Sequence, residues 1–165
     1  MLASTVHPQG WFDMESRLAE LERLAAELAA IDERIIDPRP TALGRAELLA
    51  ARKRVYETLH PSSRHGGAPG RAGGGKALRR TEAGLPPVRS HAADAACHTG
   101  LSERSVRQLV QIAEDIPAPL RDLIRDTPLA RRQRLLLEVA RTHRDPAEQR
   151  RRLDAALTTT LPERP

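Results

Sequence analysis

Six polar side chains between residues 102 and 111 have the types and spacing of a DNA-reading helix. Arginine can hydrogen-bond two acceptors of guanine at once, glutamine can do the same with adenine, and serine suits a base or a phosphate. In the stretch SERSVRQLVQIAEDI they are interleaved with apolar residues at helical spacing. We expect them to face the major groove of double-stranded DNA; the alternative is the polar face of an ordinary bundle helix. The set is Ser102, Arg104, Ser105, Arg107, Gln108 and Gln111.

The residues around this stretch fit a helix-turn-helix spanning residues 90–116. Ala96 is small enough to let two short helices cross, and Gly100, four positions later, tolerates the positive φ that the turn needs. Leu101 is expected to anchor the turn in the core, with Val106 and Leu109 facing inward from the second helix. All these spacings agree with one another, which favours the DNA-reading interpretation over an ordinary bundle helix.

Two other groups of residues were candidates for chemistry. Residues 70–76, GRAGGGK, have the spacing of a phosphate-binding loop, but Ala77 stands where a magnesium-binding hydroxyl belongs, and no strand precedes the loop. His91, Cys97 and His98 lie close in sequence but provide too few ligands for a structural zinc. We therefore expect Cys97 near the core with the histidines exposed, and we predict no cofactor, no metal and no enzymatic activity.

The positive charge of the chain gathers just before the helix-turn-helix. Residues 60–89 hold six basic side chains against Glu82 alone, together with seven of the ten glycines, whereas residues 1–59 are slightly acidic. A basic, glycine-rich stretch attracts phosphate without regard to sequence. We expect a flexible linker that contacts the DNA backbone; a merely solvated linker is the alternative. The candidate contacts are Arg71, Lys76, Arg79 and Arg80.

The elements that must position these residues are all expected to be helices. Residues 16–36 and 41–59 form a predicted N-terminal helical hairpin, divided by Pro38 and Pro40, with Thr41 as a helix cap and residues 52–54 on the exposed side of the second helix. The first helix has apolar residues at coiled-coil spacing, which favours docking on a neighbouring helix and leaves a homodimer open. These residues are Leu21, Leu24, Leu28, Ile31 and Ile35, and the apolar face of the second helix is Leu43, Leu48, Ala51, Val55 and Leu59.

Beyond the linker the pattern predicts about five short helices. Their expected ranges are 90–99, 102–116, 119–126, 129–142 and 146–158, and no segment has the alternation of a strand. The predicted organisation is thus all-α: an N-terminal helical segment (1–59), the basic linker (60–89) and a helix-turn-helix DNA-binding domain with supporting C-terminal helices (90–165).

Composition agrees with a cytoplasmic protein. No stretch is apolar for long enough to span a bilayer, and residues 1–10 lack the charged start and apolar run of a secretory signal. A single cysteine excludes an internal disulfide and fits a reducing compartment. We expect a cytoplasmic, nucleoid-associated protein with no membrane partner.

With these residues in place, the chain resembles the ParB/RepB-like partition proteins of plasmids and prophages. The likeness lies in AAIDERIIDPRPTALGRAELLAARKRVYETLHP (29–61), in the glycine-rich RHGGAPGRAGGGK (64–76) and in HTGLSERSVRQLVQIAEDIPAPLRDLIRDTPLA (98–130). Together these segments cover most of residues 29–157. The resemblance implies DNA binding by the central helix-turn-helix, and a partition ATPase as partner.

The chain also departs from that family. The N-terminal ParB/sulfiredoxin-like domain, with its nucleotide-contacting motif, has no counterpart, so we expect a shortened form. Arg34 stands where the family's motif has asparagine, Asp37 where it has arginine, and Gly44 where it has glutamate. These departures argue against CTP binding and leave DNA reading untouched.

The sequence therefore predicts specific DNA binding in partition or in transcriptional regulation. Both roles use the same reader, and the sequence does not separate them. The alternative function is a helical interaction or dimerisation module with no specific DNA site.

Overall fold

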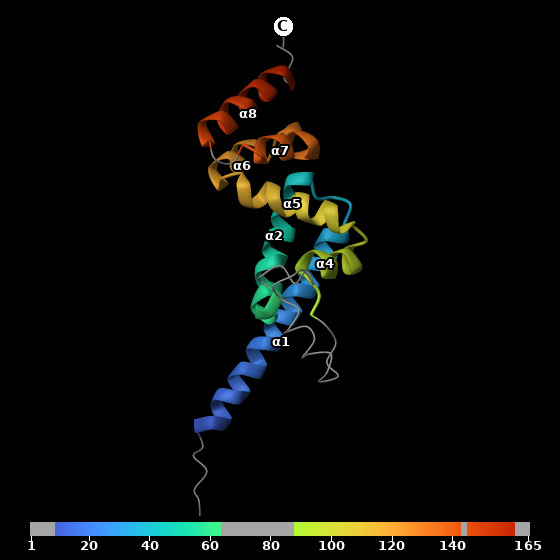
Figure 1. Ribbon diagram of the computed structural model, residues 1–165, viewed down its shortest axis with the longest axis vertical. Helices are drawn as coiled ribbons and strands as arrows, with labels where there is room; N and C mark the ends of the chain where they lie inside the picture. The colour runs from blue at the N-terminus through green and yellow to red at the C-terminus, as the bar shows by residue number, and fades with distance from the viewer. Residues whose placement is uncertain (1–8, 64–87, 143–144, 161–165) are drawn as a thin grey trace, which may run out of the picture.

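The computed structural model describes residues 9–63, 88–142 and 145–160, and every regular element in these ranges is a helix. The all-α prediction is confirmed. The predicted linker lies almost wholly outside the described residues. In chain order the elements are α1 (Gln9–Ile36), α2 (Ala42–Leu59), the 3-10 turn η1 (Pro61–Ser63), α4 (His91–Thr99), α5 (Glu103–Asp115), α6 (Ala118–Ile124), the 3-10 turn η2 (Pro128–Arg131), α7 (Gln133–Ala140) and α8 (Pro146–Thr160) (Figure 1).

Helices α1 and α2 pack against each other as the predicted hairpin. Thr41 caps α2, because its side-chain oxygen accepts a hydrogen bond from the Gly44 amide at 3.1 Å. Helix α1 begins at Gln9, earlier than the expected start near Ser16. Its C-terminal half buries Leu24, Ile31 and Ile35. Its N-terminal half extends away from the other helices (Figure 1).

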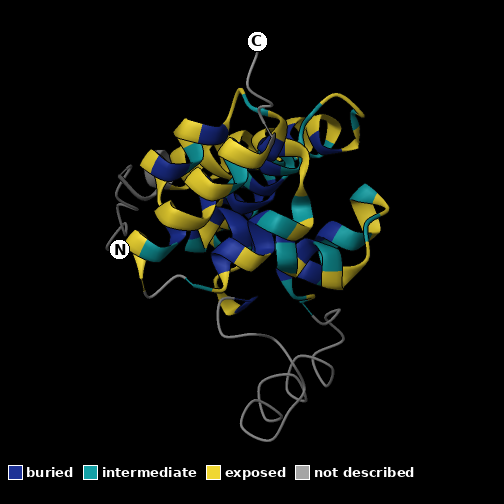
Figure 2. Ribbon diagram, turned by 90° about the horizontal axis from the view of Figure 1, so that it is seen from above, coloured by how far each residue is buried: buried dark blue, intermediate teal, exposed yellow. Residues whose placement is uncertain are grey.

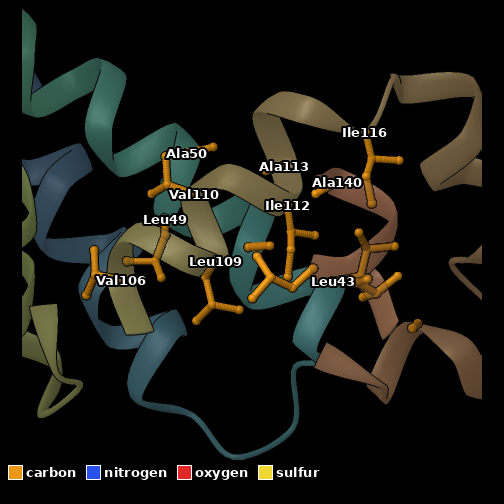
Figure 3. Packing of buried hydrophobic residues seen from close by; sticks show 14 of the residues in the cluster. Leu43, Leu49, Ala50, Val106, Leu109, Val110, Ile112, Ala113, Ile116 and Ala140 are labelled. Carbon is orange, nitrogen blue, oxygen red and sulfur yellow. The ribbon is translucent and has the colours of Figure 1, made fainter. Parts of the chain in front are cut away.

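Helix α2 lies at the centre of the molecule, between α1 and α5. Leu43, Leu49 and Ala50 of α2 meet an apolar face of α5, which includes Leu109 and Ile112 (Figure 3). Of the apolar face predicted for α2, Leu43 and Val55 are buried, and Leu48, Ala51 and Leu59 pack against the core as half-buried residues. A helix with partners on two sides buries a wider arc than one stripe. The buried set is Leu43, Ala46, Leu49, Ala50, Arg52, Val55 and Tyr56.

Arg52 overturns one expectation outright. The sequence predicts that Arg52 lies on the exposed side of α2, but its side chain is fully buried. Its guanidinium forms ion pairs with Asp32 of α1 at 2.5 Å and with Asp94 of α4 at 2.8 Å. A buried charge is tolerated only when it is paired, and the two carboxylates come from helices far from Arg52 in sequence.

The C-terminal helices cover the remaining side of α5. The single helix predicted over residues 129–142 is instead η2 followed by α7, with the break at Arg132, whose backbone is not helical (φ −90°, ψ 73°). Helix α8 is fastened by the buried amide of Gln149, whose Nε2 donates to the carbonyl oxygens of Asp115 and Val139 at 2.9 and 3.2 Å. Buried residues from both halves of the chain thus form one continuous core (Figure 2).

In the described ranges, no helix combines the length and the apolar character that a membrane crossing requires.

Candidate nucleic-acid interface

The segment from Ser90 to Asp115 folds as helix, turn and helix, with a side-chain cap at the start of each helix. The Ser90 hydroxyl accepts from the Ala93 amide, and the Ser102 hydroxyl accepts from the Ser105 amide, both at 3.2 Å. Gly100 ends α4 in the left-handed region (φ 71°), and its amide donates to the Ala96 carbonyl at 3.2 Å. The positive φ predicted for Gly100 is confirmed, and Ser102 is the N-cap of α5.

The packing of α4 against α5 differs from the prediction in one residue. The small residues that α4 buries in the core are Ala92 and Ala95, whereas Ala96 is only half-buried. Ala95 lies one residue earlier, which turns it by about 100° around the helix toward α5. Leu101 packs on the core as a partly buried residue.

Helix α5 has two clearly different faces. Val106 and Leu109 point into the core, as predicted, and are fully or almost fully buried. Arg104 and Arg107 are exposed on the opposite side, and Gln108 and Gln111 lie beside them, half-buried. The four polar residues are spaced i, i+3, i+4 and i+7, so they form one stripe along the helix.

Three side chains of the predicted DNA-reading set have partners at the start of the helix. The guanidinium of Arg107 is held by the carboxylate of Glu103, one turn earlier. The hydroxyls of Ser102 and Ser105 hydrogen-bond each other at 2.9 Å, and Ser105 is half-buried at the edge of the stripe. The two serines therefore serve the helix start, while the arginines and glutamines form the outward stripe.

The charge along α5 is uneven. Both arginines lie in the first two turns, and Glu114 and Asp115 occupy the last turn. Lys53 of α2 pairs with Glu114 at 2.8 Å. The positive part of the helix is thus its N-terminal half, the half that enters the major groove in helix-turn-helix proteins.

A cleft of about 440 Å³ lies beside the stripe, between α5, α2 and the start of α4. Arg107 and Gln111 contribute to its wall, together with Lys53 and Glu57 of α2. Arg104 and Gln108 do not line the cleft. Arg104 is therefore the member of the stripe that is exposed and lies outside the cleft, whereas Gln108 lies outside the cleft but is half-buried.

Buried groups beneath the interface hold α4 in place. Asp94 of α4 pairs with Arg52, and the Tyr56 hydroxyl donates to the Arg89 carbonyl at 2.9 Å, just before α4. Sequence reasoning missed this connection. The only available signal was an acidic residue in the first turn of α4, which has an ordinary role at a helix N-terminus.

The residues considered for metal binding are placed differently from the prediction. His91 was expected to be exposed but is buried, and burial together with the nearby cation of Arg52 lowers the pKa of its imidazole to about 4. Cys97 was expected near the core but is exposed, and its sulfur accepts from the Arg89 guanidinium at 2.9 Å. In helix α4, His91 faces α2 and Cys97 lies on the outer side. Across the described part of the chain, no three histidine, cysteine or acidic side chains come together as a metal site.

The basic linker residues Arg71, Lys76, Arg79 and Arg80, and the loop-like residues 70–76, lie outside the described residues. Their predicted contacts with the DNA backbone stay predictions.

Comparisons of the chain with protein-family models, with curated proteins and with solved structures find no match.

Proposed function

We propose that the protein binds double-stranded DNA sequence-specifically through the α4–α5 helix-turn-helix. The observation that carries the proposal is the form of α5: a capped helix, anchored by its apolar face, with two arginines and two glutamines in one outward stripe. Its neighbouring turn has the glycine in the left-handed conformation that separates two closely packed short helices.

In the proposed complex, the N-terminal half of α5 enters the major groove. Arg104 and Gln108 contact base edges, because they belong to the outward stripe of α5 and match guanine and adenine respectively. Arg107 leaves its ion pair with Glu103 and binds a base or a phosphate instead. The hydroxyl of Ser102, at the start of α5, contacts the sugar-phosphate backbone of the DNA. Arg71, Lys76, Arg79 and Arg80 add attraction that does not depend on sequence.

The proposed biological role is partition of a plasmid or chromosome, or transcriptional regulation, in a nucleoid-associated protein of the cytoplasm. It rests on the resemblance of residues 29–61, 64–76 and 98–130 to ParB/RepB-like proteins. For partition, the expected protein partner is a partition ATPase. The test that separates partition from regulation uses a partition ATPase encoded next to this protein, immobilised on a support. Partition predicts that the chain is retained on the support with the ATPase and not on the support without it.

The primary test is binding to fragments of the host replicon and to random duplex, each over a salt series. The proposal expects one or a few fragments to bind at least about a hundredfold more tightly than random duplex, with binding retained at moderate salt. Equal, weak binding to all fragments that salt abolishes would mean that only non-specific phosphate contacts occur.

A double variant tests the reader itself. Arg104→Ala/Gln108→Ala should weaken specific binding by roughly 30- to 20,000-fold, since each of the two lost base contacts costs about 1–3 kcal/mol, and should leave binding to random duplex nearly unchanged. The matched control is Gln133→Ala/Arg134→Ala at the start of α7, which removes the same residue types outside the helix-turn-helix. Equal losses in the two variants would refute the assignment of the reader.

A second candidate function is an interaction module in which the helix-turn-helix is only structural. The observation that favours it is the exposure of Met14, Leu18 and Leu21 on the projecting half of α1. Under this function, the Arg104→Ala/Gln108→Ala variant keeps every binding activity of the protein, and no fragment is preferred.

A further inference from the structure

The projecting half of α1 carries a stripe of exposed apolar side chains. Met14, Leu18 and Leu21 are 50%, 53% and 47% exposed, and Ala25 and the half-buried Leu28 continue the same line. The steps between them alternate four and three residues, which is the spacing of a two-stranded coiled-coil seam. Single exposed leucines are ordinary, but three large apolar residues in one seam on a helix that extends from the body indicate a partner surface (Figure 1).

We propose that this stripe is covered by the α1 helix of a second copy, in a parallel, in-register coiled coil. In the heptad that the stripe defines, Leu18 and Ala25 occupy a positions, and Met14, Leu21 and Leu28 occupy d positions. A second copy is the partner that supplies the same seam with the same length and spacing.

The charges beside the seam select the parallel orientation. Arg17 falls at a g position and Glu22 at the following e position, five residues later. In a parallel pair, a g residue meets the e residue five positions on in the other helix, so Arg17 of each copy meets Glu22 of the other. An antiparallel pair sets g against g and e against e, which brings like charges together. Arg17 and Glu22 form no ion pair within the described part of the chain, so they are available for this contact.

Two other charged residues of this half lie on the far side of the helix. Glu20 and Arg23 pair with each other at 2.6 Å and occupy positions outside the seam. Glu20 and Arg23 keep the outer face of α1 polar, and neither of them pairs with Arg17 or Glu22.

The geometry of α1 leaves room for the second helix. At about 100° per residue, the face that buries Leu24, Ile31 and Ile35 lies roughly a quarter turn from the centre of the stripe. A second α1 can therefore lie along Met14, Leu18, Leu21 and Ala25 without displacing α2 or α4, whereas Leu28 also packs on the core of its own copy. Two-fold symmetry then places the two bodies on opposite sides of the coiled coil, each with its own α5 exposed.

The seam is short, about two heptads, so the dimer is expected to be weak, with a Kd between about 1 µM and 1 mM. The inference does not depend on DNA binding, because it concerns the chain alone. If the proposed function also holds, the dimer presents two readers related by symmetry, as paired half-sites require.

The test is sedimentation velocity of the full chain without DNA, from about 1 µM to 1 mM. The expected result is a monomer–dimer equilibrium. Leu18→Ser/Leu21→Ser should raise the Kd at least about tenfold, whereas the matched control Ala19→Ser/Ala26→Ser, on the opposite face, should change it less than about threefold. A monomer over the whole range overturns the proposal, and so does an equal effect of the two pairs.

Charge exchange and cross-linking test the orientation. Arg17→Glu alone and Glu22→Arg alone should each weaken the dimer, and the double exchange should restore it to within about threefold. In a Cys97→Ser background, Leu21→Cys should form a disulfide-linked dimer under mild oxidation, because identical d positions meet only in a parallel, in-register pair. Failure of restoration together with absence of the cross-link overturns the parallel arrangement.

Discussion

Replacing Arg52 with methionine should destabilise the fold more than any surface change, because this one side chain connects three helices. Its guanidinium pairs with Asp32 of α1 and Asp94 of α4, and the side chain is fully buried in α2. Methionine fills a similar volume but leaves two carboxylates facing each other without a cation.

The expected cost follows from the burial of the partners. Removing one member of a buried ion pair typically costs about 3–5 kcal/mol. The Asp32 and Asp94 side chains are 14% and 17% exposed, so water still reaches them and the lower end of the range applies, about 3 kcal/mol. For a chain of this length, that corresponds to a fall in Tm of roughly 6–12 °C.

The measurement is urea unfolding followed by far-ultraviolet circular dichroism at constant protein concentration. The matched control is Arg54→Met, two residues along α2 and exposed, which should change the free energy of unfolding by less than about 0.5 kcal/mol. The triple variant Arg52→Met/Asp32→Asn/Asp94→Asn should recover at least half of the loss, because it leaves no unpaired charge.

A loss below about 1 kcal/mol in Arg52→Met would refute this reasoning. So would a triple variant less stable than the single one, since the cost would then come from lost packing and not from uncompensated charge.

Three further changes have defined outcomes. The pKa of His91 is about 6.5 in the unfolded chain and about 4 in the folded protein, so the unfolded chain binds the proton first as pH falls. The contribution of His91 to the free energy of unfolding should be fully present above pH 6.5 and fall by up to about 3 kcal/mol toward pH 4. His91→Gln should flatten this part of the stability–pH profile. In Gly100→Ala the added Cβ meets no atom within 4 Å, but the turn holds the alanine at a positive φ. Chemical denaturation should therefore show a loss of about 1–2 kcal/mol in the free energy of unfolding; no loss would mean that the turn adopts another conformation. Ile112→Ala, at a fully buried position, should cost about 2–5 kcal/mol by thermal unfolding, against less than about 1 kcal/mol for the exposed Leu123→Ala.

Local rules were enough for the helix ends and for the turn of the candidate site. Thr41, Ser90 and Ser102 cap their helices, and Gly100 takes the positive φ that its position in the sequence predicted. Each of these outcomes depends on a few neighbouring residues, which is why one sequence contains the information. The division of α5 into an apolar and a polar face is likewise a matter of spacing along one helix.

Burial of polar residues could not be read from the chain. Arginine and glutamine are exposed in most proteins and histidine is intermediate, yet Arg52, His91 and Gln149 are each buried here by partners many residues away. Cys97, an apolar-like residue in the pattern of α4, is exposed because the core is formed by Ala92 and Ala95 on the other side of that helix.

The sequence by itself determined the all-α class, most helix boundaries, the caps and the polar stripe of α5, because spacing, capping and glycine conformation act over a few residues. Only the tertiary structure decided that α2 is surrounded by α1 and α5, that Arg52 joins Asp32 to Asp94, and that α1 leaves Met14, Leu18 and Leu21 uncovered. These three features depend on which helices pack together. The sequence of a helix shows that one face is apolar but not which neighbouring helix covers that face.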